Sequence, residues 1–294
     1  MIKTLFLCLA LAAPPVFSGE KNGETENYSI STHSVLDFKD VKEGSSLTGS
    51  RTYKQVYWTI NDSGHPPAIY PLDAGGKMIK PEWTKTYKGV KILDALNIDW
   101  EWLTSDGEGN LLIGDTGNNN NYRRDLAFYL ISEPNPYMAV ETGITAKYPL
   151  RYPDQDAFPP DEENFNFDAE AAYYYEGRLY LITKNRSDTL AKIYKFGELK
   201  PWQMNVPEIS GTFDFGGMVS DAEVSPDKSH LAVLTYDYVW LFERPESGDF
   251  FKGRRGKKEI KLGQCEGIAF DGDKLLISNE QRHLFKIKFR EILK

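Results

Sequence analysis

The stretch Phe167–Arg186 reads FDAEAAYYYEGRLYLITKNR, and its order of features recurs along the chain. It opens with the acidic triplet Asp168-Ala169-Glu170 and continues as an apolar run. It then turns at Glu176-Gly177 and returns as the alternating run Leu179–Thr183. Two such runs joined by a turn that contains glycine are typical of a β-hairpin. The stretch therefore predicts the first two strands of a repeated β-unit.

Four other stretches have the same order of features with different residues. Three of them begin with a triplet that ends in glutamate and continue into a turn that contains aspartate: Asp99-Trp100-Glu101, Asp221-Ala222-Glu223 and Gln264-Cys265-Glu266. The weakest copy comes first in the chain and has Ser45 in place of the glutamate. A repeat of roughly 40–70 residues made of short strands is typical of a β-propeller. We predict an all-β, five-bladed propeller over residues 19–294, with six blades as the alternative.

The first 18 residues, Met1–Ser18, have the layout of a secretory signal peptide. Lys3 supplies the charged start, Leu5–Ala13 the apolar segment, and Ser18 a small residue before the cleavage point. The apolar run is shorter than the ~20 residues that a spanning helix needs, so we expect no transmembrane segment. The layout predicts export, and an exported chain without disulfides is typical of a bacterial periplasmic or secreted protein. Only Cys265 remains after cleavage, which excludes an intramolecular disulfide.

The formal net charge of −8 argues against a nucleic-acid partner, because phosphate backbones are bound by basic surfaces. The short basic run Arg254–Lys258 contains a glycine, and we expect it to be a solvated loop on an outer hairpin. The expected partner is a small molecule at the mouth of the propeller, and the expected state is a monomer.

The sequence also predicts an outer strand for each blade. Tyr28–Phe38 has strand composition and is expected to complete the blade that the C-terminus begins. The other expected outer strands are in the regions Lys77–Trp83, Ile144–Leu150, Val206–Phe213 and Glu259–Leu262.

The innermost strand of every blade lines the central channel of a propeller, so the leading residues of these strands are expected to meet at one mouth. These residues are Ser45, Glu101, Glu170, Glu223 and Glu266. Each close pair of glutamates would repel by about 1–4 kcal/mol at a surface-like dielectric. Raised pKa values, basic partners or a bound cation would relieve this, and Ca²⁺ accepts such oxygen ligands. The alternative is that the acids bind only water and neighbouring backbone amides.

Polar residues that follow the second strands are expected to form a rim above this ring. The predicted ligand-binding residues are Asn61, Asn118, Asn185, Asp237, Asn279, Glu280 and Arg282. Lys184 and Arg186 are candidates for stabilising charge on a phosphate, and Asp62 or Asp115 for the general base. The simpler interpretation of the two basic side chains is ion pairing with the surplus acids.

Several inner-strand starts resemble those of the soluble calcium-activated nucleotidases, which are apyrase-like five-bladed propellers. The similar segments are Ser45-Ser46-Leu47, Trp100-Glu101-Trp102-Leu103, Ala169-Glu170-Ala171 and Cys265-Glu266-Gly267-Ile268. The resemblance implies a central Ca²⁺ held by these Ser and Glu side chains. Glu223 departs from the pattern, because that family has serine in the fourth blade. Gly114–Gly117 is similar to the family's glycine-rich stretch, and Lys184-Asn185-Arg186 only echoes its paired arginines.

The chain also resembles uncharacterised exported bacterial propellers that share Asn-Asp-Ser-Gly, Gly-Asp-x-Gly-Asn-Asn and Thr-Lys-Asn-Arg-Ser segments. Three functions stay open at this point. The first is a calcium-dependent hydrolase of phosphoanhydrides or phosphoesters. The second is a calcium-dependent esterase or lactonase, in which Asn61, Asn118 and Asn279 help to hold the ion and a carboxylate or His283 activates water. The third is a non-catalytic propeller that binds a ligand or a protein. A Gly-x-Ser-x-Gly elbow and a Walker A loop are both absent from the sequence.

Overall fold

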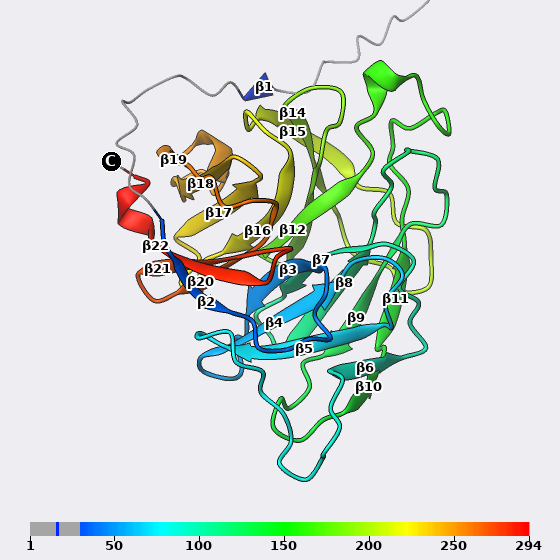
Figure 1. Cartoon of the computed structure of the whole chain (residues 1–294). Coiled ribbons are helices and arrows are strands. Elements are labelled where there is room, and N and C mark those ends of the chain that lie inside the picture. Colours follow the sequence, from blue (N-terminus) through cyan, green and yellow to red (C-terminus); the bar gives the residue numbers. More distant parts are fainter. Residues whose placement is uncertain (1–15, 18–29, 294) are drawn as a thin grey trace, which may run out of the picture.

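The structure is a computed structural model that describes residues 16–17 and 30–293. The predicted signal peptide, residues 1–18, lies outside the described residues apart from strand β1 (Val16–Phe17). The described residues form five sheets around one axis, which confirms the predicted five-bladed, all-β propeller (Figure 1). The only helical segments among the described residues are three short 3-10 turns. No helix in this part of the chain is long and apolar enough to cross a membrane.

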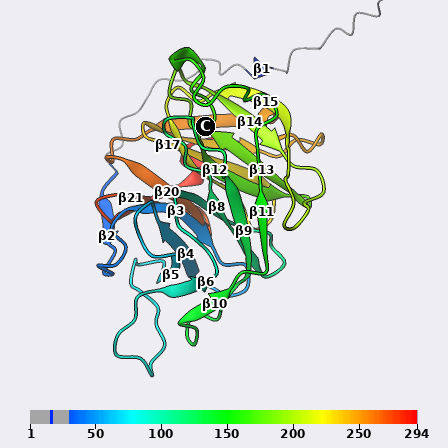
Figure 2. The ribbon, with the colours of Figure 1, turned by 90° about the vertical axis from the view of Figure 1, so that its right-hand side faces the viewer.

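Apart from β10, the strands of the first two blades follow the order of the chain. Blade one consists of β3 (Gly44–Gly49), β4 (Val56–Asn61), β5 (Ala68–Asp73), β6 (Val90–Leu93) and β10 (Glu141–Gly143). Blade two consists of β7 (Trp100–Ser105), β8 (Asn110–Asp115), β9 (Ala127–Ser132) and β11 (Ala146–Pro149). The predicted outer strand of blade two is confirmed by β11. Figure 2 shows β10 beside β6 at the outer edge of blade one.

The other three blades have the same order of strands from the axis outward. Blade three consists of β12 (Ala169–Tyr175), β13 (Arg178–Thr183), β14 (Leu190–Lys195), β15 (Glu208–Asp214) and β1. Blade four consists of β16 (Val219–Val224), β17 (His230–Thr235), β18 (Tyr238–Glu243) and β19 (Arg255–Glu259). Blade five consists of β20 (Cys265–Asp271), β21 (Lys274–Asn279), β22 (His283–Lys288) and β2 (Thr32–Val35).

The ring is closed by strands from both ends of the chain. The N-terminal strand β2 pairs with β22, which confirms the expected completion of the last blade for Thr32–Val35; residues 28–29 of the predicted strand lie outside the described residues (Figure 1). At the axis each innermost strand contacts its two neighbours, in the order β3, β7, β12, β16 and β20, and β20 returns to β3. Every residue of β3, β7 and β16 is buried, which explains why these strands do not alternate between apolar and exposed polar residues.

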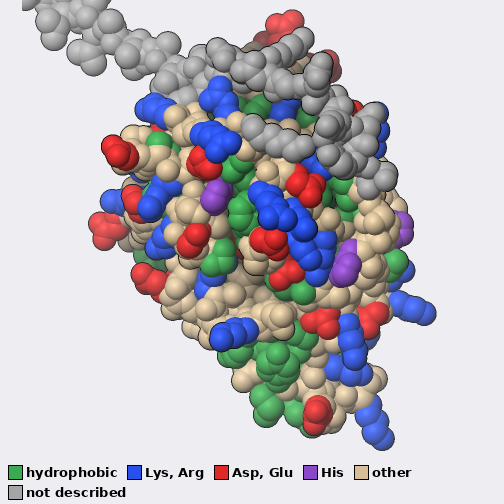
Figure 3. All heavy atoms as spheres, turned by 90° about the vertical axis from the view of Figure 1, so that its left-hand side faces the viewer, with side chains coloured by type: hydrophobic (Ala, Val, Ile, Leu, Met, Phe, Trp, Pro, Cys, Tyr) green, Lys and Arg blue, Asp and Glu red, His purple; other side chains and the backbone are tan. Residues whose placement is uncertain are grey.

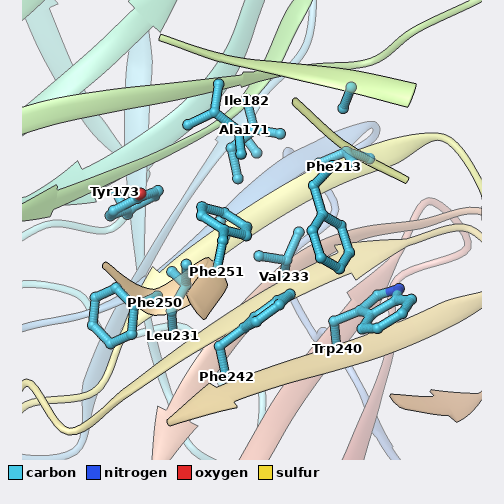
Figure 4. Packing of buried hydrophobic residues seen from close by; sticks show 14 of the residues in the cluster. Ala171, Tyr173, Ile182, Phe213, Leu231, Val233, Trp240, Phe242, Phe250 and Phe251 are labelled. Carbon is cyan, nitrogen blue, oxygen red and sulfur yellow. The ribbon is translucent and has the colours of Figure 1, made fainter. Parts of the chain in front are cut away.

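Aromatic side chains fill the space between blades. Between blades three and four, the Phe213 ring of β15 meets Trp240 and Phe242 of β18 edge-on, with centroid distances of 5.2 and 5.3 Å (Figure 4). Phe251, from the 3-10 turn η2 (Phe250–Lys252) before β19, closes the same cluster at 5.6 Å from Phe213. Edge-to-face contacts of this kind add to the free energy of burying the rings. They fix the angle between neighbouring blades and so the position of the inner strands.

Two predicted outer strands are wrong. The Lys77–Trp83 region makes only an isolated bridge, Leu72 to Met78, and it contains Pro81, which has no backbone N–H for a ladder. β6 and β10 form the outer strands instead. In blade four the outer strand is β19, which overlaps the predicted Glu259–Leu262 only at Glu259.

The basic run Arg254–Lys258, predicted to be a loop, thus lies mostly in strand β19. Gly256 allows this, because a Cβ at that position would lie 1.8 Å from the carbonyl oxygen of Ile292. Lys257 lies over the rings of Tyr238 and Trp240, at 4.3 and 5.1 Å. Basic side chains therefore cover the aromatic outer face of the blade while their charges stay near solvent.

Two buried acids on β16 tie the inner strands together below the mouth. Asp221 accepts hydrogen bonds from the backbone N–H of Leu47 at 3.1 Å and of Ile268 at 2.8 Å, and from the Ser46 hydroxyl at 3.1 Å. Glu223 accepts from the N–H of Gly49 and of Phe270, at 2.8 and 2.7 Å. One strand of blade four thereby holds β3 and β20, where the ring closes.

We predict that Asp221→Ala lowers the free energy of unfolding by about 2–4 kcal/mol, because two buried N–H groups and one hydroxyl lose their acceptor. Denaturant unfolding followed by intrinsic fluorescence measures this change. Asp273→Ala, at an exposed turn of blade five, is the matched control and is expected to change stability by about 0.5 kcal/mol or less. Equal stability of the two variants would show that Asp221 does not hold the ring.

Candidate functional site

A β-bulge at the start of every inner strand positions the candidate site. In each blade the pairing with the second strand skips one residue, and the skipped residues are Ser45, Glu101, Glu170, Ser220 and Glu266. A bulge residue leaves the regular ladder, so its side chain is re-aimed. The fivefold repeat therefore brings one side chain per blade to the same level of the ring.

The structure corrects the placement of Glu223, which was predicted to join this ring. The bulge of blade four lies at Ser220, three residues earlier, and Glu223 instead binds backbone amides, the Thr48 hydroxyl and Arg51. Asp221-Ala222-Glu223 has the same residue pattern as the repeated triplet, but the bulge in this strand lies before the triplet and not at its glutamate. For Glu223 the alternative interpretation, an acid that binds neighbouring amides, is the one that the contacts support.

The four other predicted residues line one cavity of about 200 Å³ at the channel mouth, and its wall is almost wholly polar. Among the described residues, its carboxylates are those of Glu43, Asp62, Glu101, Glu170, Glu266 and Glu280. Its cationic side chains are Lys184 and Arg186. Six carboxylates against two bases leave a marked excess of acid if all are ionised.

A second tier of acids lies just behind the first. Carboxylate oxygens of Glu101, Asp168 and Glu170 lie within 4.8 Å of one another, and all three residues are buried. Asp62, Asp99 and Glu101 form a second such group. Asp99 and Asp168 were not predicted as site residues, although each precedes its bulge glutamate by two positions. The repeated Asp-x-Glu spacing was the signal that could have identified them.

The two bases are already engaged with these acids. The Lys184 ammonium lies 3.0 Å from Oε2 of Glu170 and donates to the Tyr236 hydroxyl at 2.6 Å. Tyr236 in turn donates to Oε1 of Glu266 at 2.9 Å. The Arg186 guanidinium lies 2.8 Å from Asp168 and 3.3 Å from Glu170. Tyr236 is thus a site residue that the sequence did not reveal.

The crowding of acids is visible in their pKa values. Burial, with Asp168 and Glu266 nearby, raises the pKa of Glu170 to about 8 although Lys184 and Arg186 oppose the shift. Burial and the Glu170 carboxylate hold the pKa of Glu101 well above its usual range. Burial and the neighbouring Asp62 raise the pKa of Asp99 to about 7. The site therefore retains protons that isolated carboxylates would have lost.

One oxygen of the cavity has no donor. Oε2 of Glu266 is buried and makes no hydrogen bond with any described residue. The hydroxyl of Ser220, the bulge residue of blade four, is likewise buried without a partner. Buried polar atoms are normally paired, because a missing hydrogen bond costs about 1–3 kcal/mol. Glu266 lines the cavity, so its free oxygen is available to a ligand there, whereas Ser220 is not among the lining residues.

Three predicted rim residues accept hydrogen bonds from backbone N–H groups and do not line the cavity. Asn61, Asp115 and Asn279 occupy the same register, opposite the residue that precedes each bulge. Their side-chain oxygens accept from the N–H of Lys42, Asp99 and His283, at 2.9, 3.0 and 2.9 Å. Asp115 is also paired with Arg123 at 3.0 Å, so it does not face the cavity as a general base.

The remaining predicted residues are divided between the cavity and the surrounding loops. Glu280 lines the cavity and accepts a hydrogen bond from Gln264, and Asp62 lines it as predicted. Asn118 donates its backbone N–H to Asp168 at 2.7 Å and so supports the acid cluster from behind. Asn185 closes its own loop by accepting from the N–H of Ser187. Asp237 and Arg282 are not among the residues that line the cavity.

No known protein-family model matches this chain, and no curated protein sequence matches it. Solved structures do share its outline. A chain of the mitotic checkpoint complex is 12% identical over 97% of this chain and 98% of its own length, with a TM-score of 0.44. The PQQ-bound aldose sugar dehydrogenase of Streptomyces coelicolor is 10% identical over 93% and 99%, with a TM-score of 0.48. The computationally designed Ika8 protein is 8% identical over 83% and 70%, with a TM-score of 0.33. Similarities this low carry no information about what the chain binds or catalyses.

We predict that Glu170 makes the metal-free protein less stable as the pH rises. The folded state holds the proton of Glu170 up to a pKa of about 8, whereas the unfolded state releases it near the ordinary value of 4.5. The stabilising contribution is therefore complete below pH 4.5 and is lost as the pH rises through 8.

Melting temperatures from pH 5 to 9 in EGTA, compared between the wild type and Glu170→Gln, measure this effect. The wild type is expected to lose stability relative to the variant across that range, because glutamine imitates the protonated acid. Glu176→Gln, at the exposed turn of the same blade, is the control and should keep the wild-type profile. The prediction would be contradicted if the melting temperature of the wild type rose relative to that of Glu170→Gln as the pH increased.

Proposed function

We propose that the channel mouth binds Ca²⁺ and that the protein is a calcium-dependent hydrolase of phosphoanhydride or phosphoester substrates. The observation that carries the proposal is the buried group of Glu101, Asp168 and Glu170, with carboxylate oxygens within 4.8 Å of one another. The unpartnered Oε2 of Glu266 in the same cavity supports it independently. On the layout of residues 1–18 we also propose that the protein is exported.

The donors at the mouth suit a hard cation. They are carboxylate oxygens and the Ser45 hydroxyl, which lies 3.2 Å from Oε2 of Glu101, and no histidine or cysteine lines the described cavity. Ca²⁺ prefers six to eight oxygen ligands of this kind, and a dication would offset the excess of acid. When bound, it would polarise a phosphoryl oxygen and lower the pKa of a coordinated water.

Lys184 and Arg186 are the residues that we assign to the phosphoryl group. Each is held by carboxylates of the cluster, at 3.0 and 2.8 Å, so its position is fixed before a substrate arrives. Preorganised cations of this kind stabilise charge that develops on phosphate oxygens. A cavity of about 200 Å³ is smaller than the ~300–1,000 Å³ of typical ligand pockets, so it would hold the reacting group and leave the rest of the substrate outside.

Asp62 is our candidate for the general base. It lines the cavity, and its neighbour Asp99 has a pKa raised to about 7 by burial and by Asp62 itself. A carboxylate in this position can accept a proton from an attacking water. The esterase or lactonase alternative is less well supported, because Asn61, Asn118, Asn279 and His283 do not line the cavity.

We predict that millimolar Ca²⁺ raises the melting temperature of the wild type by several degrees, because it binds the folded cluster and not the unfolded chain. Thermal unfolding with Ca²⁺ and with EGTA measures the shift. Glu101→Gln and Glu170→Gln are expected to remove most of it, whereas Glu176→Gln retains it. An equal shift in all four proteins would place the calcium site elsewhere.

We predict that the protein releases phosphate from nucleoside di- or triphosphates in Ca²⁺ and not in EGTA. Lys184→Met is expected to lower kcat about 100–1,000-fold, as loss of one charge-stabilising donor does, and Asp62→Asn about 100–10,000-fold. Both variants should keep a calcium-dependent thermal shift, which separates catalysis from ion binding. Turnover of aryl esters or lactones in place of phosphates would favour the esterase alternative. No turnover with the shift preserved would indicate a binding module.

A further inference from the structure

A second cavity, of about 620 Å³, lies in blade one. The segments that line it are residues 40–42 before β3, residues 65–70 that lead into β5, and residues 86–91 that lead into β6. Its apolar lining consists of Pro66, Ala68, Tyr70, Tyr87 and Val140. The volume is within the range of small-molecule sites, and the walls are far less polar than those of the channel mouth.

The rim of this cavity is basic in a chain of net charge −8. Lys42, Lys88 and Lys91 line it together with His65, which lies 3.7 Å from the Glu43 carboxylate, and Asp40 is the one acid among the described lining residues. None of these three lysines forms an ion pair with another described residue, whereas Lys184 and Lys192 each pair with an acid. A local excess of exposed positive charge attracts anions.

Tyr87, which lines the cavity, has a buried hydroxyl without a partner among the described residues. Tyr87 is 7% exposed, stacks on Phe38 at a centroid distance of 6.3 Å, and its hydroxyl makes no hydrogen bond within the described structure. The neighbouring Tyr70 hydroxyl, in contrast, accepts from the Asn61 side chain at 3.1 Å. Burial raises the pKa of both phenols, that of Tyr70 to about 12, so each keeps its proton at neutral pH. Tyr87 therefore offers a donor that no described residue uses.

Gly89 fixes the shape of the cavity wall beside Tyr87. It has φ +81°, and a Cβ at this position would lie 2.7 Å from the Tyr70 ring. Only glycine allows the chain to pass this close to the ring with a positive φ. The rigid contact keeps Tyr87 and Lys88 at the edge of the cavity.

The loop between β5 and β6 adds more apolar and basic side chains. Trp83 is 61% exposed, and this loop, cyan in Figure 1, extends far from the axis at the lower end of the molecule. Figure 3 shows hydrophobic side chains gathered at that end, with Lys and Arg side chains near them. Apolar surface next to unpaired positive charge is complementary to an apolar anion.

We propose that the blade-one cavity binds a small aromatic anion, an aryl carboxylate, sulfonate or phosphate. The ring lies against the apolar lining formed by Tyr70, Tyr87 and Val140, and the anionic group lies among Lys42, Lys88 and Lys91. The inference does not depend on the chemistry at the channel mouth, because the two cavities share no lining residue.

Isothermal titration calorimetry of the full chain in EGTA tests the proposal, with 1-naphthoate as the probe and 2-naphthol as its neutral counterpart. Wild type is expected to bind 1-naphthoate clearly more tightly than 2-naphthol. The double variant Lys88→Gln/Lys91→Gln should bind 1-naphthoate about five- to tenfold more weakly than wild type, with an unchanged affinity for 2-naphthol. Lys77→Gln/Lys80→Gln, on the same loop outside the cavity, is the control and should bind as wild type does.

Tyr87→Phe supplies a second, independent measurement. It removes only a hydroxyl without a partner, so the melting temperature should not fall, while the affinity for 1-naphthoate is expected to drop several-fold. Three results would overturn the proposal: no heat of binding with millimolar 1-naphthoate, equal affinity for the charged and neutral probes, or equal affinity in wild type and Lys88→Gln/Lys91→Gln. None of these results bears on the calcium or hydrolase proposals, which are measured at the other cavity.

Discussion

The β-bulge at the start of each inner strand is the feature on which the rest of the site depends. Five strands meet around a narrow axis, and a regular ladder would leave most of their side chains packed between blades. The bulge frees one residue per strand from that ladder at the same height in every blade. The repeat thus converts a local irregularity into a ring of side chains, and the chemistry of the mouth follows from which residues occupy it.

Burial alone does not distinguish a structural acid from a functional one in this ring. Glu223 and Glu170 are both on inner strands and both buried, at 2% and 3% exposure. Glu223 accepts from two backbone N–H groups, a hydroxyl and Arg51, so its charge is matched by fixed donors. Burial raises the pKa of both acids, and that of Glu170, which faces other carboxylates, rises to about 8. The difference is in the partners: amides of the scaffold hold the first acid, whereas the second competes with its neighbours for two bases.

The sequence was sufficient for the fold and for four of the five ring positions, because each blade repeats a glycine-containing hairpin after a leading polar residue. It failed in blade four, where Asp221-Ala222-Glu223 has the letters of the repeat but the bulge lies at Ser220. The position of the bulge depends on how β16 pairs with β17, and the residue types of the triplet alone do not determine that pairing. The prediction for Asn61, Asp115 and Asn279 failed for another reason. Their side-chain oxygens, which would suit a ligand, accept hydrogen bonds from backbone N–H groups instead. Outer strands such as β19 depend on a glycine contact with a distant segment, which no local pattern reveals.

The fold repeats five times, yet the charge of the mouth is not fivefold symmetric. Blades two and three contribute Asp99, Glu101, Asp168 and Glu170, whereas blade four places Met218 and Ser220 at the corresponding positions. Both cavity-lining bases follow the second strand of blade three, on the same side as the acids. A cation at this mouth would therefore be drawn toward Glu101 of blade two, which forms no ion pair with a described base, because Lys184 and Arg186 repel it from the acids of blade three. The side of blade four, where the Tyr236 hydroxyl links Lys184 to Glu266, would then stay open to the group that approaches the ion. The unequal distribution of charged residues among the blades, and not the propeller fold itself, would therefore determine from which side a substrate approaches the ion.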